Sequence, residues 1–156
     1  MKIRFPQASS QTPDEFRERV RSAFGFLVET AGFHEEPVPS SGFHNPVAVW
    51  FANKTTRIVV EGINWGMNAR VALGQASEAF ENFDLEDLVA ELAPSTDLPA
   101  EERKGGQLTQ LPQLADWLRV FGSDVLSGDF RVFPRLGARV DLRKAQFRQS
   151  PTALPR

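Results

Sequence analysis

The fold is decided by residues 47–73, which read VAVWFANKTTRIVVEGINWGMNARVAL. Residues 47–52, 57–61 and 69–73 are short runs of apolar, largely β-branched or aromatic side chains, as is typical of β-strands. Asn53-Lys54 is typical of a tight turn, because Asn tolerates a positive φ. We therefore expect an antiparallel meander of three to four strands, in which a fourth strand near Val38 can only be an edge strand between Pro37 and Pro39.

Side chains alternate between the two faces of a strand, so Trp50 should lie opposite Val49 and Phe51. A helix packed on the Val49 face leaves two positions for Trp50. It lies either beneath other helices or at the surface, where a partner can reach it. The sequence leaves both open.

Helices flank the meander on both sides in the chain. Thr12-Pro13-Asp14-Glu15 is a capping box, and the apolar spacing behind it predicts a helix over residues 13–31 that ends at Gly32. After the meander, Asp84 can cap a helix over residues 85–92. We expect an exposed loop at residues 94–108, a helical stripe from Leu111 to Leu126, and a final helix that becomes regular near Pro134.

The expected fold class is thus α+β: a meander packed by one N-terminal helix and two to three C-terminal helices. The length of 156 residues suits one domain, which we place at residues 1–148 with a frayed tail at 149–156. The absence of Cys excludes disulfides and thiol chemistry. No signal peptide or bilayer-spanning run is recognisable, so a cytoplasmic bacterial protein without membrane contact is expected.

No motif in the chain predicts chemistry. The two histidines, His34 and His44, do not have the spacing of a zinc-binding helix, and prolines separate them. No serine lies in a G-x-S-x-G elbow, and no glycine pattern matches a phosphate-binding loop. We predict no catalytic residue, no metal and no cofactor, hence a non-enzymatic protein.

A basic ridge near the C-terminus is the first candidate binding surface. Residues 1–130 carry 19 acidic and 11 basic residues, a net charge of −8, whereas residues 131–156 carry seven basic residues and one acid. Arginines recur every four residues and so share one side of a helix. The ridge either binds nucleic acid or pairs with the acidic body, and the second interpretation is favoured because the whole chain is acidic. Its residues are Arg131, Arg135, Arg139, Arg143, Lys144 and Arg148.

The second candidate surface is the link between the second and third strands. Trp and Met are enriched at protein interfaces, and Trp is a frequent hot spot of binding energy. The alternative is that Trp65 folds back over the sheet edge and covers the core. The candidate partner-binding residues are Ile63, Asn64, Trp65 and Met67 of this link, together with Trp50.

The order of elements resembles a group of small, uncharacterised bacterial α+β proteins of the immunity-protein type. The resemblance spans roughly residues 13–147 and is carried by Gly32-Phe33, the meander, Leu118-Arg119-Val120-Phe121-Gly122 and Leu126-Ser127-Gly128-Asp129-Phe130. It implies a binding role and no catalytic residue.

We therefore expect a protein-binding module, in its most specific form an immunity-type inhibitor of a bacterial toxin. Nucleic-acid binding through the basic ridge and binding of a small ligand are the alternatives. Homodimerisation through the sheet face or edge stays open.

Overall fold

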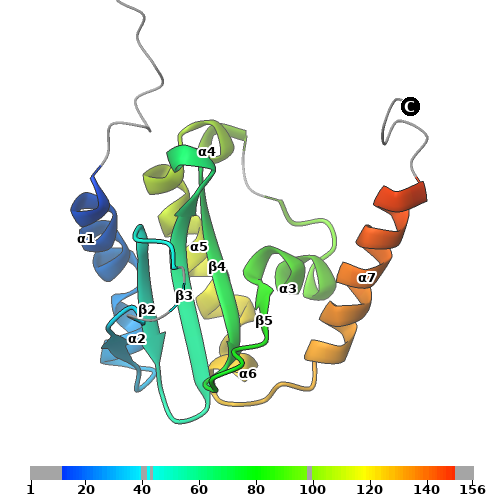
Figure 1. The fold of residues 1–156 in the computed structure, drawn as a ribbon, viewed down its shortest axis with the longest axis horizontal. Helices are drawn as coiled ribbons and strands as arrows, with labels where there is room; N and C mark the ends of the chain where they lie inside the picture. Colours follow the sequence, from blue (N-terminus) through cyan, green and yellow to red (C-terminus); the bar gives the residue numbers. More distant parts are fainter. Residues whose placement is uncertain (1–11, 40–41, 43, 98–99, 150–156) are drawn as a thin grey trace, which may run out of the picture.

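A computed structural model of the chain describes residues 12–39, 42, 44–97 and 100–149. At its centre is a five-stranded antiparallel sheet in which the strands follow one another in chain order. Figure 1 shows α5 and α6 behind this sheet, α1 and α2 on the side of β2, and α3 and α7 beyond β5. The α+β prediction is confirmed. The strands are β1 (His34–Glu36), β2 (Ala48–Ala52), β3 (Thr56–Ile63), β4 (Asn68–Gln75) and β5 (Asn82–Asp84).

The number of strands differs from the prediction, because the sheet has five and not three to four. The two additional strands are the edges β1 and β5, each of three residues with mostly polar side chains. Strands this short carry no alternation that a sequence pattern can reveal. The expected edge strand at Val38 is wrong, because β1 lies before Pro37 and its backbone pairs with β2 from His34 to Glu36.

The N-terminal helix begins as predicted and ends earlier. The Glu15 amide donates to Thr12 Oγ1 at 3.1 Å, which completes the capping box. The predicted helix over 13–31 is broken at Phe24 into α1 (Pro13–Ala23) and α2 (Gly25–Glu29). Gly32 adopts a φ of 75°, so it ends the segment in the left-handed conformation expected of it.

Five helical segments follow the sheet, and two of them are very short. Asp84 caps the first, accepting from the Glu86 amide at 2.9 Å as predicted. The loop predicted at 94–108 contains one helix, and the predicted stripe from Leu111 to Leu126 is divided at Gly122. A Cβ at Gly122 would lie 2.6 Å from the Leu118 carbonyl oxygen. The segments are α3 (Leu85–Leu92), α4 (Ala100–Lys104), α5 (Gln107–Phe121), α6 (Ser123–Leu126) and α7 (Phe133–Gln149).

The start of α7 beside Pro134 agrees with the prediction. The helix includes Gln149, and the remainder of the expected tail, like residues 1–11, lies outside the described residues. Within the described ranges, no helix is both long and apolar enough to cross a lipid bilayer.

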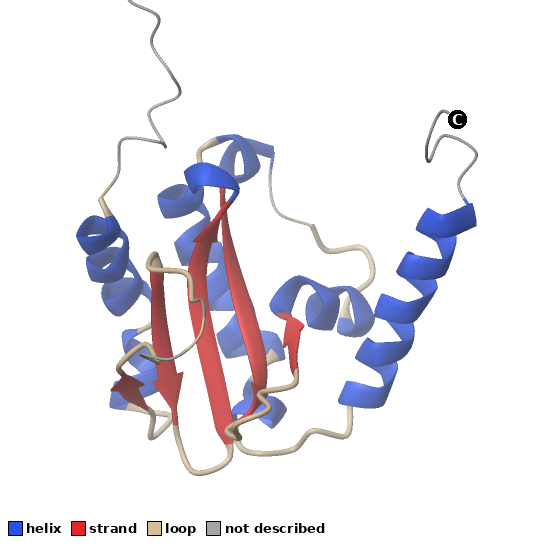
Figure 2. Cartoon of the chain, in the orientation of Figure 1, coloured by secondary structure: helices blue, strands red, loops and turns tan. Residues whose placement is uncertain are grey.

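The main hydrophobic core occupies one face of the sheet, and a smaller cluster of Ala48, Val59 and Ala72 is buried on the other. Val49 and Phe51 of β2 point into it, as do alternate residues of β3 and β4, and α1, α3 and α5 cover them. The helices in Figure 2 leave the front face of the sheet free. The strand residues in the core are Val49, Phe51, Ile58, Val60, Ala69, Val71 and Leu73.

Side-chain hydrogen bonds connect both ends of β3 to the helices. At one end, the buried Thr56 hydroxyl donates to the Val125 carbonyl at 2.7 Å, and Asn53 Nδ2 donates to the Leu126 carbonyl at 3.2 Å. Because Thr56 is fully buried, this bond satisfies a hydroxyl that water cannot reach.

At the other end, Gln110 of α5 holds the turn between β3 and β4. Its Oε1 accepts from the Ala69 amide at 2.8 Å. Its Nε2 lies 3.2 Å from the Met67 carbonyl, 3.3 Å from Asn68 Oδ1 and 3.3 Å from the Arg103 carbonyl. Gln110 is only 1% exposed, so water does not compete for these hydrogen bonds.

We expect Gln110→Leu to lower the free energy of unfolding by about 1–3 kcal/mol, because the Ala69 amide would be buried without its acceptor. Urea denaturation measures this. Gln113→Leu on the same helix is the control, since Gln113 forms no hydrogen bond with another described side chain, and we expect a change within about 0.5 kcal/mol. Equal small effects of the two substitutions would contradict the role of Gln110.

Candidate functional site

The turn between β3 and β4 places three candidate partner-binding residues at the surface. Trp65 is 92% exposed and Met67 46% exposed, and Asn64 is also exposed. Ile63, the last residue of β3, is half-buried. Trp65 therefore does not fold back over the sheet edge, and its indole is available to another molecule.

The backbone at this turn is strained. Asn64 and Trp65 both have a φ of 53°, in the left-handed region, and Gly66 follows with a φ of 85°. Asn and Gly adopt this region readily, whereas for Trp it costs about 1–2 kcal/mol. The exposed indole adds little packing in return. Strain of this kind concentrates at functional sites, so it supports Trp65 as a candidate binding residue.

The strained turn is anchored to helix α5 by hydrogen bonds. Gln110 holds both the Met67 carbonyl and the Ala69 amide, where the turn leads into β4. We name Ile63–Met67 the hairpin tip. Because its base is fixed to α5, the tip presents Trp65 with little backbone entropy left to lose on binding.

Trp50 lies on the sheet face that the described helices leave uncovered. Its register partner on β3 is Val59, which in turn pairs with Ala72 of β4. The indole is half-buried, 6.0 Å from the ring of Phe80 and 5.6 Å from that of His44, between ring centroids. Trp50 is thus neither beneath a helix nor fully exposed, since loop residues flank it.

Arg57 is the most constrained side chain on this outer face. Its guanidinium carbon lies 5.7 Å from the centre of the Trp50 ring and 5.2 Å from that of Phe80. Nε donates to Glu36 at 3.3 Å, and Nη1 donates to the Ser77 carbonyl at 2.8 Å. Cation–π contacts and hydrogen bonds together hold the guanidinium in one place.

The link between β4 and β5 folds over the outer face to deliver Phe80. Phe80 has a φ of 34°, the second strained aromatic residue of the described chain. Gly74 permits this approach, because a Cβ there would lie 2.3 Å from the Glu81 carbonyl oxygen. A glycine is therefore required where the link crosses β4.

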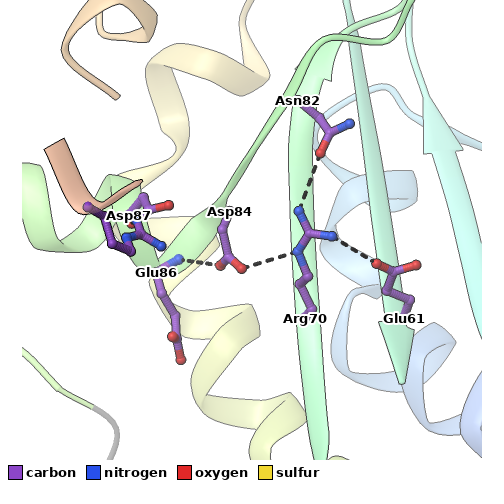
Figure 3. A network of polar contacts seen from close by, with 7 residues as sticks. Glu61, Arg70, Asn82, Asp84, Glu86 and Asp87 are labelled. Atoms are coloured by element: carbon purple, nitrogen blue, oxygen red, sulfur yellow. Dashed lines mark hydrogen bonds and ion pairs between the residues drawn. The ribbon is translucent and has the colours of Figure 1, made fainter. Parts of the chain in front are cut away.

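Arg70 organises the other half of the outer face (Figure 3). Nη1 lies 3.2 Å from Glu61 on β3, and Nε lies 3.2 Å from Asp84 at the end of β5. Nη2 is 3.5 Å from Asn82 Oδ1. One guanidinium thus connects β3, β4 and β5, and it fixes the carboxylate that caps α3.

Burial acts on the acids at the start of α3. It raises the pKa of Asp84 above its ordinary value, although the Glu86 amide and Arg70 favour the charged form. Burial likewise raises the pKa of Glu86, and the neighbouring charge of Asp84 adds to the effect. Desolvation therefore outweighs the ion pair with Arg70.

We expect Asp84→Asn to become more stable relative to the wild type as the pH rises. A carboxyl whose pKa is raised on folding does not destabilise the protein when the pH is below its ordinary pKa of 3.8. It destabilises the protein fully once the pH exceeds the raised pKa. Asn keeps the oxygen that caps α3 and cannot ionise. Denaturation from about pH 3 to pH 7 measures the difference. A relative stability that falls with pH would show that the Arg70 ion pair outweighs burial.

The basic ridge lies largely against α3. Arg135 and Arg139 both pair with Glu91, at 3.5 Å and 3.3 Å, and Arg143 pairs with Asp87. These ion pairs are those expected if the ridge docks on the protein's own acidic body. A nucleic acid would have to compete with Glu91 and Asp87 for three of the arginines.

The other ridge residues do not contact α3. Arg131 binds Asp129 with its guanidinium and its amide, which lowers the pKa of Asp129 to about 2. Lys144 and Arg148 are exposed and form no ion pair with the described residues. Four of the six ridge residues are thus engaged in ion pairs with the protein's own acids.

The two histidines are placed apart on the outer face. His34 lies on the edge strand β1, and His44 is beside Trp50. In the ranges that the structure describes, no three His, Asp or Glu residues are grouped so that they could hold a metal ion.

Three residues that shape these surfaces were not singled out from the sequence. Arg57 could have been found, since it alternates with Ile58 and must face away from the core. Gln110 stands beside Leu111 in an apolar stripe, where a buried amide predicts a hydrogen-bonded role. Phe80 lies in a link without periodicity, and no sequence signal places it.

Comparison with models of known protein families, with curated protein sequences and with solved structures finds no match to this chain. The immunity-type resemblance stays a prediction from the sequence.

Proposed function

We propose that this protein is a non-enzymatic protein-binding module that uses the hairpin tip, and Trp65 above all, to anchor a partner. The observation that carries the proposal is a 92% exposed tryptophan in the left-handed conformation. The strained backbone costs stability in the isolated protein, and the exposed indole contributes almost no burial energy there to offset it. A partner that buries the indole offsets this cost.

The energetics of such a contact favour tight binding. Full burial of a large apolar side chain contributes about 1.5–3 kcal/mol, and tryptophan is enriched among residues whose loss costs at least 2 kcal/mol. Met67 adds an adaptable apolar contact next to the indole. Because Gln110 holds the tip, binding does not have to order it first.

The charge of the chain favours a basic partner. Residues 1–130 carry a net charge of −8, and three arginines of the basic ridge that could offset it are engaged with Glu91 and Asp87. An acidic body attracts a basic protein and speeds their encounter. More specifically, we propose that the protein is an inhibitor of the immunity type, which captures a basic toxin such as a nuclease.

We expect Trp65→Ala to weaken partner binding by at least about 2 kcal/mol, roughly 30-fold, while the free energy of unfolding changes by less than about 0.5 kcal/mol. The tagged protein is used to capture its partner from an extract of the native host at low and high salt. The affinity for the captured protein is then measured by calorimetry.

Phe147→Ala is the matched control, because Phe147 is 74% exposed on α7 and is not part of the hairpin tip. The control should bind as the wild type does. Equal binding by Trp65→Ala and the wild type would contradict the proposal, as would a large loss of stability with intact binding. Nucleic acid retained only at low salt would instead favour the basic ridge.

A further inference from the structure

The uncovered face of the sheet contains a hollow with a volume of about 720 Å³. Val59 and Ala72, each 4% exposed, form its apolar floor. Trp50 and Phe80 stand on one side, and charged side chains of β1, β3 and β4 surround the rest. The hollow is therefore a polar-rimmed pocket with a dry floor, as ligand-binding sites commonly are.

The hollow already holds a cation of the protein's own. The Arg57 guanidinium lies against both aromatic rings and donates to Glu36. Trp50 and Phe80 thus provide the electron-rich ring faces that attract a guanidinium or ammonium group. The side of the hollow formed by Trp50 and Phe80 is therefore compatible with cationic groups.

The charges of the lining leave room for a further cation. Each arginine is matched by one glutamate, Arg57 by Glu36 and Arg70 by Glu61. Glu78 lines the hollow as well, and it forms no ion pair with the described residues. The lining therefore carries one more carboxylate than guanidinium, and Asp84 beside Arg70 adds to the negative potential.

We propose that this hollow receives the cationic end of a lysine or arginine side chain from the basic partner that Trp65 anchors. The inference rests on the proposed function for the origin of that side chain. The hollow itself supplies the recognition: a dry floor and the edges of Trp50 and Phe80 beside Arg57 for the aliphatic stem, and Glu78 and Glu61 as acceptors for the cation.

One partner can cover both contacts. Val59, on the floor, and Ile63, at the start of the hairpin tip, are four residues apart on β3. That corresponds to about 13 Å of strand at roughly 3.3 Å per residue. An ordinary interface covers about 800 Å² on each partner, which is wide enough to include the hollow and the tip.

The three tryptophans allow a test that does not need the partner. Trp50 reports on the hollow, Trp65 on the tip, and Trp117, 6% exposed in the core, is the internal reference. The probe is tetra-arginine, acetylated and amidated at its ends, added at low salt to the ¹⁵N-labelled protein. We expect the indole N–H signal of Trp50 to shift saturably and that of Trp117 to stay in place.

Glu78→Gln should weaken the response of Trp50 by about two- to fivefold, since it removes one ionic partner without disturbing an ion pair of the fold. Glu29→Gln is the matched control, because Glu29 is an exposed acid on α2 that does not line the hollow. A Trp50 signal that does not move, that moves equally with tetra-glutamate, or that is equally affected by the two substitutions would overturn the inference.

The two proposals fail separately. If Trp50 responds as expected but Trp65→Ala binds its partner normally, the hollow stays a cation site and the anchoring role of Trp65 is lost. If Trp65→Ala loses its partner and Trp50 does not respond, only the hollow is ruled out.

Discussion

The arrangement of the candidate surfaces depends on the buried amide of Gln110. This side chain of α5 binds the Ala69 amide and the Met67 carbonyl, which both lie on the β4 side of the turn that carries Trp65. Hydrogen bonds in a water-free site are strong and directional. These bonds hold the strained backbone in place, and without them we expect Trp65 to relax out of the left-handed conformation.

The second constraint is that the helices cover only one face of a sheet whose other face has an apolar centre surrounded by charged side chains. Val59 and Ala72 remain buried on the uncovered face because Trp50 and the link carrying Phe80 flank them. Arg57 and Arg70 complete this face with ion pairs to three neighbouring acids. The result is a hollow above a second, small hydrophobic cluster of Ala48, Val59 and Ala72.

The sequence predicts those features that local chemistry determines. The helix caps at Thr12 and Asp84, the left-handed Gly32 and the opposite facing of Trp50 follow from residue types and spacing. The edge strands do not, because β1 is a strand only through its pairing with β2. The placement of Phe80, and the pairing of Arg139 with Glu91 across 48 positions, depend on tertiary packing that no local pattern encodes.

The rigidity of the hairpin tip can be measured by the hydrogen exchange of the Ala69 amide. That amide donates to the Gln110 side chain, so its exchange rate reports on this one bond. We expect exchange as slow as that of Val71, the buried residue two positions along β4. Fast exchange at Ala69 with protection at Val71 would contradict it, because the tip would then open without Gln110 holding it.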